Sequence, residues 1–144
     1  MDPVNSSVVE WKCQKAIVAF FRCLDERNYP GLLARMHPDG VWLRQGKQLK
    51  GEQQIMQAMN ARPETMRIHH ILTNLLVNVG SESERASLFA YLLVFRHDDG
   101  EKHIGPAPLK GPSAIHACNA ELRPAAGDWR IFRLENSPTF VAEA

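Results

Sequence analysis

One uninterrupted stretch, residues 65–79, constrains the fold more than any other part of the chain. It is rich in β-branched and large aliphatic residues, contains no Pro or Gly, and is followed by a turn-forming sequence. These features predict one long β-strand. Because side chains alternate between the two faces of a strand, the even-numbered residues, among them His70 and Asn74, are expected on one face. His69 is expected on the other.

Length and charge indicate one domain, residues 1–144, with a small molecule or a protein as partner; the pocket described below favours a small hydrophobic molecule. The 144 residues are 44% hydrophobic, which suits a single core. Seventeen basic and sixteen acidic side chains give a net charge of +1 without a run of like charges, which argues against nucleic acid as a partner. No apolar run approaches the roughly 20 residues of a membrane span, so we expect no membrane partner either.

The cysteines and the start of the chain predict a cytoplasmic protein. Cys13, Cys23 and Cys118 are an odd number and form no Cys-x-x-Cys pair, which favours buried free thiols in a reducing compartment. The first residues lack the basic start and apolar centre of a signal peptide.

Residues 5–27 are expected to form a helix. Ser7-x-x-Glu10 has the spacing of a capping box at its start. Besides the main apolar stripe there is a second apolar row that includes Trp11 and Val18, which predicts a helix enclosed by other structure. Asp25 follows these two residues at seven-residue spacing and is expected at the inner end of that row. The alternative is a solvated acid where the helix ends.

The rest of the chain predicts two further helices and several strands. A short helix follows Asn28, and another runs from Gly51 to Arg62-Pro63. The expected strands, besides the long one, are residues 41–44, 86–97, 113–123 and 129–134. Residues 103–112 hold three prolines and form a loop long enough to cover a pocket mouth. This order predicts an α+β fold in which a curled sheet surrounds helices and leaves a concave cavity.

Motif searches argue against metal, cofactor and covalent chemistry. His69 and His70 point to opposite faces of their strand and cannot share one ion, and no His-x-x-x-His or Cys-x-x-Cys spacing exists. Glycine-rich phosphate loops and Gly-x-Ser-x-Gly are also missing. We therefore expect neither a metal site nor a cofactor.

Acid–base chemistry in a hydrophobic pocket remains. His70 would be the base and Asp25 would orient its ring, while Asn74 would donate a hydrogen bond to a carbonyl or oxyanion. A strand histidine is equally often a core residue that bonds to a backbone carbonyl, so both roles stay open for His70. Further candidate ligand-binding residues are Tyr29, Trp42, Arg44, Tyr91 and His116.

Several short motifs resemble the SnoaL-like (polyketide-cyclase-like) branch of the nuclear transport factor 2-like superfamily. They are Leu24-Asp25 with Tyr29, Val41-Trp42, Lys50-Gly51, Arg67-x-x-His70-x-x-x-Asn74 and Asp128-Trp129-Arg130-Ile131. The resemblance covers residues 8–135. It implies a cone-shaped α+β (cystatin-like) barrel, with three N-terminal helices wrapped by a curved, mostly antiparallel sheet and with homodimers formed through the sheet.

Relatives in this superfamily include scytalone dehydratase, ketosteroid isomerase, limonene epoxide hydrolase and small subunits of ring-hydroxylating dioxygenases. Asp25 and His70 match the Asp–His pair of scytalone dehydratase-like members. Leu24 departs from that pattern, because those enzymes place tyrosine there, and Ala117 and Asn119 stand where many relatives have Tyr and Asp.

The resemblance implies a cofactor-free lyase or isomerase, with a non-catalytic binding or assembly protein as the alternative. Contact between Asp25 and His70 beside an open cavity would favour the enzyme, and a filled cone would favour the alternative.

Overall fold

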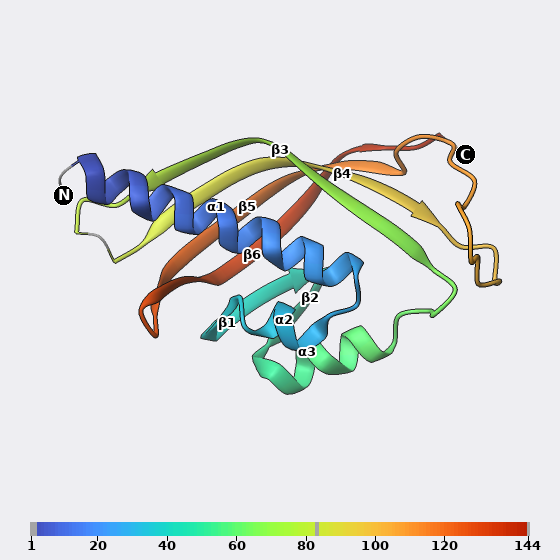
Figure 1. The fold of residues 1–144 in the computed structure, drawn as a ribbon, viewed down its shortest axis with the longest axis horizontal. Helices are drawn as coiled ribbons and strands as arrows, with labels where there is room; N and C mark the ends of the chain where they lie inside the picture. The colour runs from blue at the N-terminus through green and yellow to red at the C-terminus, as the bar shows by residue number, and fades with distance from the viewer. Residues whose placement is uncertain (1–2, 83, 144) are drawn as a thin grey trace.

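Helices and strands are both well represented in the computed structural model, which describes residues 3–82 and 84–143 (Figure 1). In chain order the elements are α1 (Pro3–Asp25), α2 (Tyr29–Leu33), β1 (Met36–Arg44), β2 (Lys47–Lys50), α3 (Gly51–Asn60), β3 (Arg67–Val79), β4 (Ala86–His97), β5 (Ala114–Ala125) and β6 (Asp128–Val141). Within the described residues, no helix is long and apolar enough to span a bilayer.

The strands form one curved, open sheet in the order β2-β1-β6-β5-β4-β3. Every neighbouring pair is antiparallel except β1 and β6, which are parallel. α1 crosses one face of the sheet diagonally, while α2 and α3 lie beside β1 and β2 (Figure 1). The expected α+β cone fold with a mostly antiparallel sheet is confirmed. β3 is an edge strand, so one row of its backbone groups has no strand partner.

The core lies between α1 and the inner face of the sheet. Ile17 and Phe20 of α1 are fully buried, as are Leu88 of β4 and Ile131 of β6. The Phe20 ring packs edge-on against the Trp42 ring at 5.1 Å between centroids. This contact fills the space between α1 and β1.

Two expectations about α1 are wrong. Ser7 does not cap the helix, because α1 already begins at Pro3 and the Ser7 hydroxyl donates to the Pro3 carbonyl within the first turn. Trp11 and Val18 are exposed, because only one stripe of α1 packs on the sheet. Asp25 nevertheless points inward, because its carboxylate contacts the backbone N–H and the ring of His70 on β3.

The alternation of side chains in β3 reverses at a β-bulge. The pairing register with β4 shifts between Thr73 and Leu76, and Asn74 has a φ of 56°. Beyond the bulge, Leu75 and Val77 pack against the core, whereas Leu76 is 67% exposed. Placing Asn74 on the inner face beside His70 is therefore wrong: Asn74 is exposed and accepts a hydrogen bond from the Thr73 hydroxyl.

Two strands are longer than expected. β1 starts at Met36 instead of residue 41, and the β1–β6 register is irregular at this added part. β6 continues past the expected end at residue 134 to Val141, and the added part pairs alongside β5.

Replacing Asn74 by Val should destabilise the fold by about 1–2 kcal/mol, because a β-branched side chain is strained at a left-handed backbone position. Asn78→Val is the matched control, since Asn78 is also exposed in β3 and does not have a positive φ. Urea denaturation measures both free energies of unfolding. Equal effects of the two substitutions would show that the bulge conformation imposes no strain.

Candidate functional site

Asp25 and His70 form a close pair where the end of α1 meets the edge strand β3. One carboxylate oxygen, Oδ2, accepts the backbone N–H of His70 at 2.8 Å. The other, Oδ1, lies 2.5 Å from His70 Nδ1. Each side chain is only 10% exposed. The carboxylate therefore binds the histidine at two points. One of them is a backbone N–H group on the open edge of the sheet, which would otherwise lack a hydrogen-bond acceptor in the protein.

This arrangement determines which ring nitrogen of His70 is available for chemistry. A carboxylate facing Nδ1 favours the tautomer that carries the proton there, which leaves the lone pair on Nε2. The Phe21 ring, 5.2 Å from the imidazole centroid, restricts the ring further. A histidine held in this way is suited to accept a proton at Nε2.

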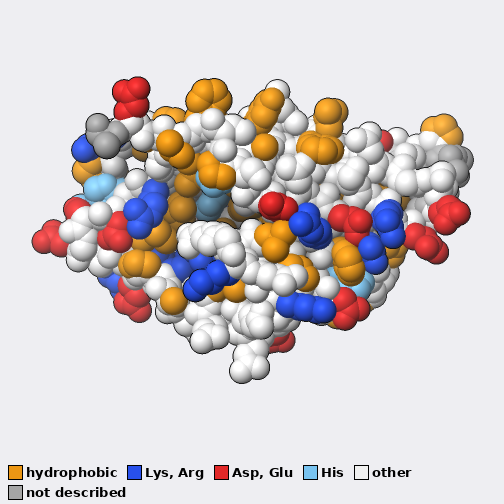
Figure 2. All heavy atoms as spheres, turned by 180° about the vertical axis from the view of Figure 1, so that it is seen from behind, with side chains coloured by type: hydrophobic (Ala, Val, Ile, Leu, Met, Phe, Trp, Pro, Cys, Tyr) orange, Lys and Arg blue, Asp and Glu red, His pale blue; other side chains and the backbone are white. Residues whose placement is uncertain are grey.

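His70 lines a cavity of about 610 Å³. Figure 2 shows a hollow on the reverse side of the molecule, with apolar and histidine side chains inside it and Lys and Arg side chains beside it. The apolar lining includes Phe21, Leu24, Met66, Ile68, Leu92 and Val94, and the charged lining consists of Arg44, Lys47, Arg62 and Arg96. A volume in this range is typical of small-molecule sites.

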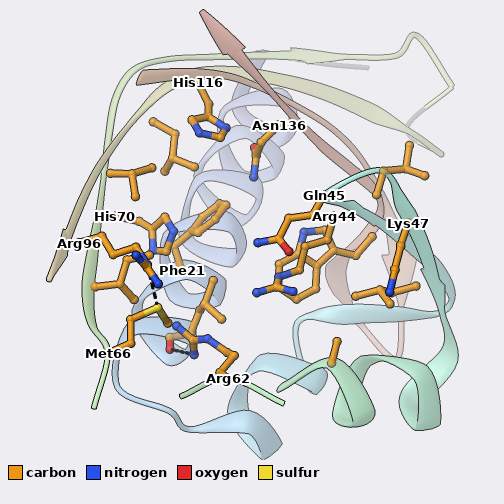
Figure 3. Close-up of a pocket in the computed structure, with 18 of the residues that line it drawn as sticks. Phe21, Arg44, Gln45, Lys47, Arg62, Met66, His70, Arg96, His116 and Asn136 are labelled. Atoms are coloured by element: carbon orange, nitrogen blue, oxygen red, sulfur yellow. Dashed lines mark hydrogen bonds between the residues drawn. The ribbon is translucent and has the colours of Figure 1, made fainter. Parts of the chain in front are cut away.

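A polar wall faces the cavity from β5 and β6 (Figure 3). His116 Nδ1 and Asn136 Oδ1 are buried, and neither has a hydrogen-bond partner among the described residues. Burial lowers the pKa of His116 below its usual value, and the electrostatic effect of the nearby His70 lowers it further, so the neutral form of His116 predominates at pH 7. Buried polar atoms without a partner are rare in proteins, so these two are well placed to bind polar atoms of a ligand.

Arg62, just after α3, is a buried charged residue, although its place in the sequence indicates only the end of a helix. Its Nη1 donates to the carbonyl of Leu24 at 3.0 Å and to the hydroxyl of Tyr29 at 2.9 Å. Tyr29 therefore supports Arg62 and does not itself line the cavity. Nothing in the periodicity of the sequence distinguishes Arg62 from an exposed terminal arginine.

The structure brings some of the expected site residues together and separates others. Trp42, Arg44, His70 and His116 line the cavity, and Asp25 contacts His70 from outside the lining. Asn74 and Tyr91 are exposed and do not line it.

Tyr91 points away because its neighbour Leu92 occupies the inner face of β4. Asn136, which lies beyond the last strand expected from the sequence, places an amide at the cavity, whereas Asn74 does not. The loop of residues 103–112 contributes no lining residue, so it does not cover this cavity.

One group of possible metal ligands occurs in the described part of the chain, away from the cavity. Ligand atoms of His97, Asp99 and His103 lie within 4.8 Å of one another, a proximity that sequence spacing did not predict. His103 Nε2 lies 2.7 Å from Asp99 Oδ2, and this hydrogen bond is the main reason that the pKa of Asp99 is lowered to about 2. Arg67 also donates to the carbonyls of His103 and Gly105. These contacts hold the start of the loop of residues 103–112 against β3.

The cysteines do not offer an activated nucleophile. All three are free, and Cys13 and Cys118 are buried, with Cys23 half-buried. Burial raises the pKa of both Cys13 and Cys118 to about 12, which keeps them as thiols at neutral pH.

Solved structures with the same fold include one enzyme of named activity. A hexachlorocyclohexane dehydrochlorinase (LinA type 2) has 16% identity and a TM-score of 0.77, covering 98% of this chain and 92% of that chain. A nuclear transport factor 2-like protein with a cystatin-like fold from Novosphingobium aromaticivorans has 18% identity and a TM-score of 0.76, covering 94% and 85%. A candidate aromatic ring hydroxylase from the same organism has 17% identity and a TM-score of 0.76, covering 97% and 93%.

At these identities the structural likeness establishes the fold alone. No curated protein matches the sequence. The family model of the SnoaL-like domain, however, matches residues 9–135, which is most of the chain. The chain therefore belongs to the SnoaL-like domain family and has the fold of nuclear transport factor 2-like proteins.

Proposed function

We propose that this protein is an enzyme that moves a proton with the His70–Asp25 pair, as a lyase or isomerase that requires no cofactor. One observation carries the proposal: Asp25 Oδ1 lies 2.5 Å from Nδ1 of a histidine that lines a cavity of about 610 Å³. A carboxylate on Nδ1 leaves Nε2 as the proton acceptor and stabilises the imidazolium that forms.

In the proposed reaction, Nε2 of His70 takes a proton from a carbon next to a carbonyl, and the electron pair moves onto the carbonyl oxygen. His116, which is neutral at pH 7, and the Asn136 amide are placed to hydrogen-bond that oxygen. When a carbon–carbon double bond lies beyond the deprotonated carbon, the electron pair is shared through a dienolate, and the imidazolium returns the proton to the far end of that double bond, which gives the conjugated isomer. When the neighbouring carbon carries a hydroxyl or halide instead, the electron pair returns from the oxygen to form a carbon–carbon double bond and that group leaves. A hydroxyl leaves as water with the imidazolium proton, whereas a halide leaves as the anion and the imidazolium releases its proton to solvent.

Two features favour this enzyme over a non-catalytic assembly protein. The alternative expected Asp25 and His70 to be apart and the cone to be filled with large apolar side chains. The pair is in contact, and the space beside it is open. The dehydrochlorinase named above also indicates that this fold can support an elimination, although fold alone does not determine function.

Replacing His70 by Asn should lower the rate of proton transfer by at least about 100-fold, the lower end for a general base. The assay is exchange of the α-protons of cyclohexanone and 4-oxocyclohexanecarboxylate in deuterated buffer, followed by nuclear magnetic resonance. His69→Asn is the control, since His69 is exposed on the opposite face of the same strand. If both variants exchange both ketones as fast as the native protein does, His70 is not the base.

His116 should make stability depend on pH. Because its folded pKa lies below the usual value of 6.5, the unfolded chain takes up a proton near pH 6.5 that the folded chain takes up only at lower pH. The free energy of unfolding should therefore fall as the pH drops below about 6.5. Urea denaturation at pH 7.5 and 5.5 should show a smaller difference for His116→Gln than for the native protein. An unchanged difference would mean that His116 protonates equally in both states.

We further propose that two copies associate through the outer face of the sheet. Ile71, Leu76, Phe89 and Tyr91 are large apolar side chains on β3 and β4 that remain about half exposed or more. In the strand register Leu76 lies opposite Phe89, so these exposed side chains form a connected patch. Such patches commonly mark interfaces between subunits.

Phe89→Lys should convert dimers into monomers, because it places a charge inside the apolar patch. Light scattering after size-exclusion chromatography measures the mass. Val18→Lys is the matched control, since Val18 is a similarly exposed apolar residue on α1. A native protein that is monomeric at high micromolar concentration would rule out the interface.

A further inference from the structure

The charged residues that line the cavity are all positive, a feature that a pocket for a purely hydrophobic molecule does not require. Four cationic side chains, Arg44, Lys47, Arg62 and Arg96, line the cavity. No aspartate or glutamate is among the described residues that line it. Figure 3 shows the side chains of Arg44, Arg62 and Arg96 converging on the cavity from three different parts of the chain.

Arg62 is the most deeply buried of these cations, with 8% of the residue exposed. The two partners of its Nη1 atom, the Leu24 carbonyl and the Tyr29 hydroxyl, are both neutral. No carboxylate among the described residues lies within ion-pair distance of it. A guanidinium has five N–H donors, and a buried charge without a counter-ion is costly. Arg62 therefore has both spare donors and an unbalanced charge.

Arg44 adds a second guanidinium to the same wall. It is half-buried at the end of β1, with its Cζ 5.7 Å from the centre of the Trp42 ring. Burial lowers the pKa of Arg44, and repulsion by the charge of Arg62 lowers it further. The two guanidinium groups are thus close enough to destabilise each other, and an anion between them would remove that repulsion.

The other two cations are exposed and lie at the rim. Lys47 is exposed on β2, and Arg96 is exposed near the end of β4. Arg96 is also the only one of the four with a carboxylate near it among the described residues, since its Nη2 lies 4.0 Å from Asp98 Oδ2. Exposed cations around a concave site raise the local concentration of anions and speed their entry.

We propose that the cavity binds small carboxylates, with the carboxylate group held by Arg44 and Arg62. Guanidinium forks match the planar geometry of a carboxylate, which a single lysine does not. The rest of the ligand then lies along the apolar wall toward His70. This assignment rests on the proposed function for the role of His70, and it names the substrate class as carboxylate-bearing carbonyl or hydroxy compounds.

The test compares two ligands of the same shape, cyclohexanecarboxylate and cyclohexanecarboxamide. Titration calorimetry at neutral pH should give an affinity for the carboxylate at least about tenfold higher than for the amide, as expected for charge-assisted hydrogen bonds. Arg44→Gln should remove most of that preference, because it lowers the affinity for the carboxylate more than the affinity for the amide. Arg133→Gln is the control for charge, since Arg133 is exposed outside the cavity.

Arg62 requires a gentler substitution, because it also bonds to Leu24 and Tyr29. Arg62→Lys keeps the charge but loses the fork, and it should weaken carboxylate binding by about tenfold. Thermal unfolding without ligand provides a further readout. Arg44→Gln should unfold at the same temperature as the native protein or a higher one, because it relieves repulsion.

Equal affinity of the native protein for the acid and the amide would overturn the carboxylate site. A preference that survives Arg44→Gln, or a lower unfolding temperature of that variant, would do so too. These measurements need no turnover. Absence of proton exchange would therefore count against the role of His70 and leave the carboxylate site standing. Equal affinity for the acid and the amide would count against the carboxylate site and leave the role of His70 standing.

Discussion

The site depends on one carboxylate that binds two groups of the same residue. Asp25 ends α1 and accepts both the backbone N–H and the ring of His70. The backbone contact is possible only because β3 is an edge strand, where N–H groups are unpaired and need another partner. The contact with the backbone of His70 therefore already fixes the end of α1 to β3, and the contact with the imidazole ring adds to it. A carboxylate on an exposed loop would leave both the strand edge and the imidazole free to move.

Arg62 makes a second contact with the same helical turn. The Leu24 carbonyl belongs to the last turn of α1, where carbonyl groups have no partner within the helix. A cation at that end is also favoured by the helix dipole. Arg62 thus binds residue 24 while His70 binds residue 25, so one helical turn connects the histidine with the arginines. Movement of this turn would disturb both parts of the cavity together.

Sequence reasoning predicted the long elements and the Asp25–His70 pair, and it failed where a local irregularity decided the outcome. The alternation in β3 holds from Arg67 to Thr73 and then reverses at Asn74, whose positive φ leaves no signal in hydrophobic periodicity. The seven-residue spacing that suggested an inward Asp25 also suggested an inward Trp11. Only Asp25 has a partner on the sheet, so tertiary contact and not periodicity decides between them.

The residues that the sequence missed share a physical reason. Arg62 and Asn136 are polar residues outside the regular hydrophobic patterns, and only the folded chain shows that Arg62 and the Oδ1 atom of Asn136 are buried. An arginine before a proline or an asparagine after a strand is ordinarily exposed. Burial of such residues reflects the curvature of the sheet, which brings β6 and the segment after α3 to the same cavity. Curvature depends on bulges and on long-range pairing, and a single sequence carries little information on either.

The electrostatics of the cavity link the base to the cationic wall. Proton abstraction converts His70 into a cation, and like charges that line one partly buried cavity repel more strongly than they would in water. With a neutral substrate, the new imidazolium would share the cavity with Arg44 and Arg62 and only Asp25 would offset it. A carboxylate ligand neutralises Arg44 and Arg62 before the proton is transferred, so Asp25 has only the charge of the imidazolium to balance. The positive charges of Arg44 and Arg62 are unfavourable in the empty cavity. Once a bound anion balances them, they no longer oppose protonation of His70.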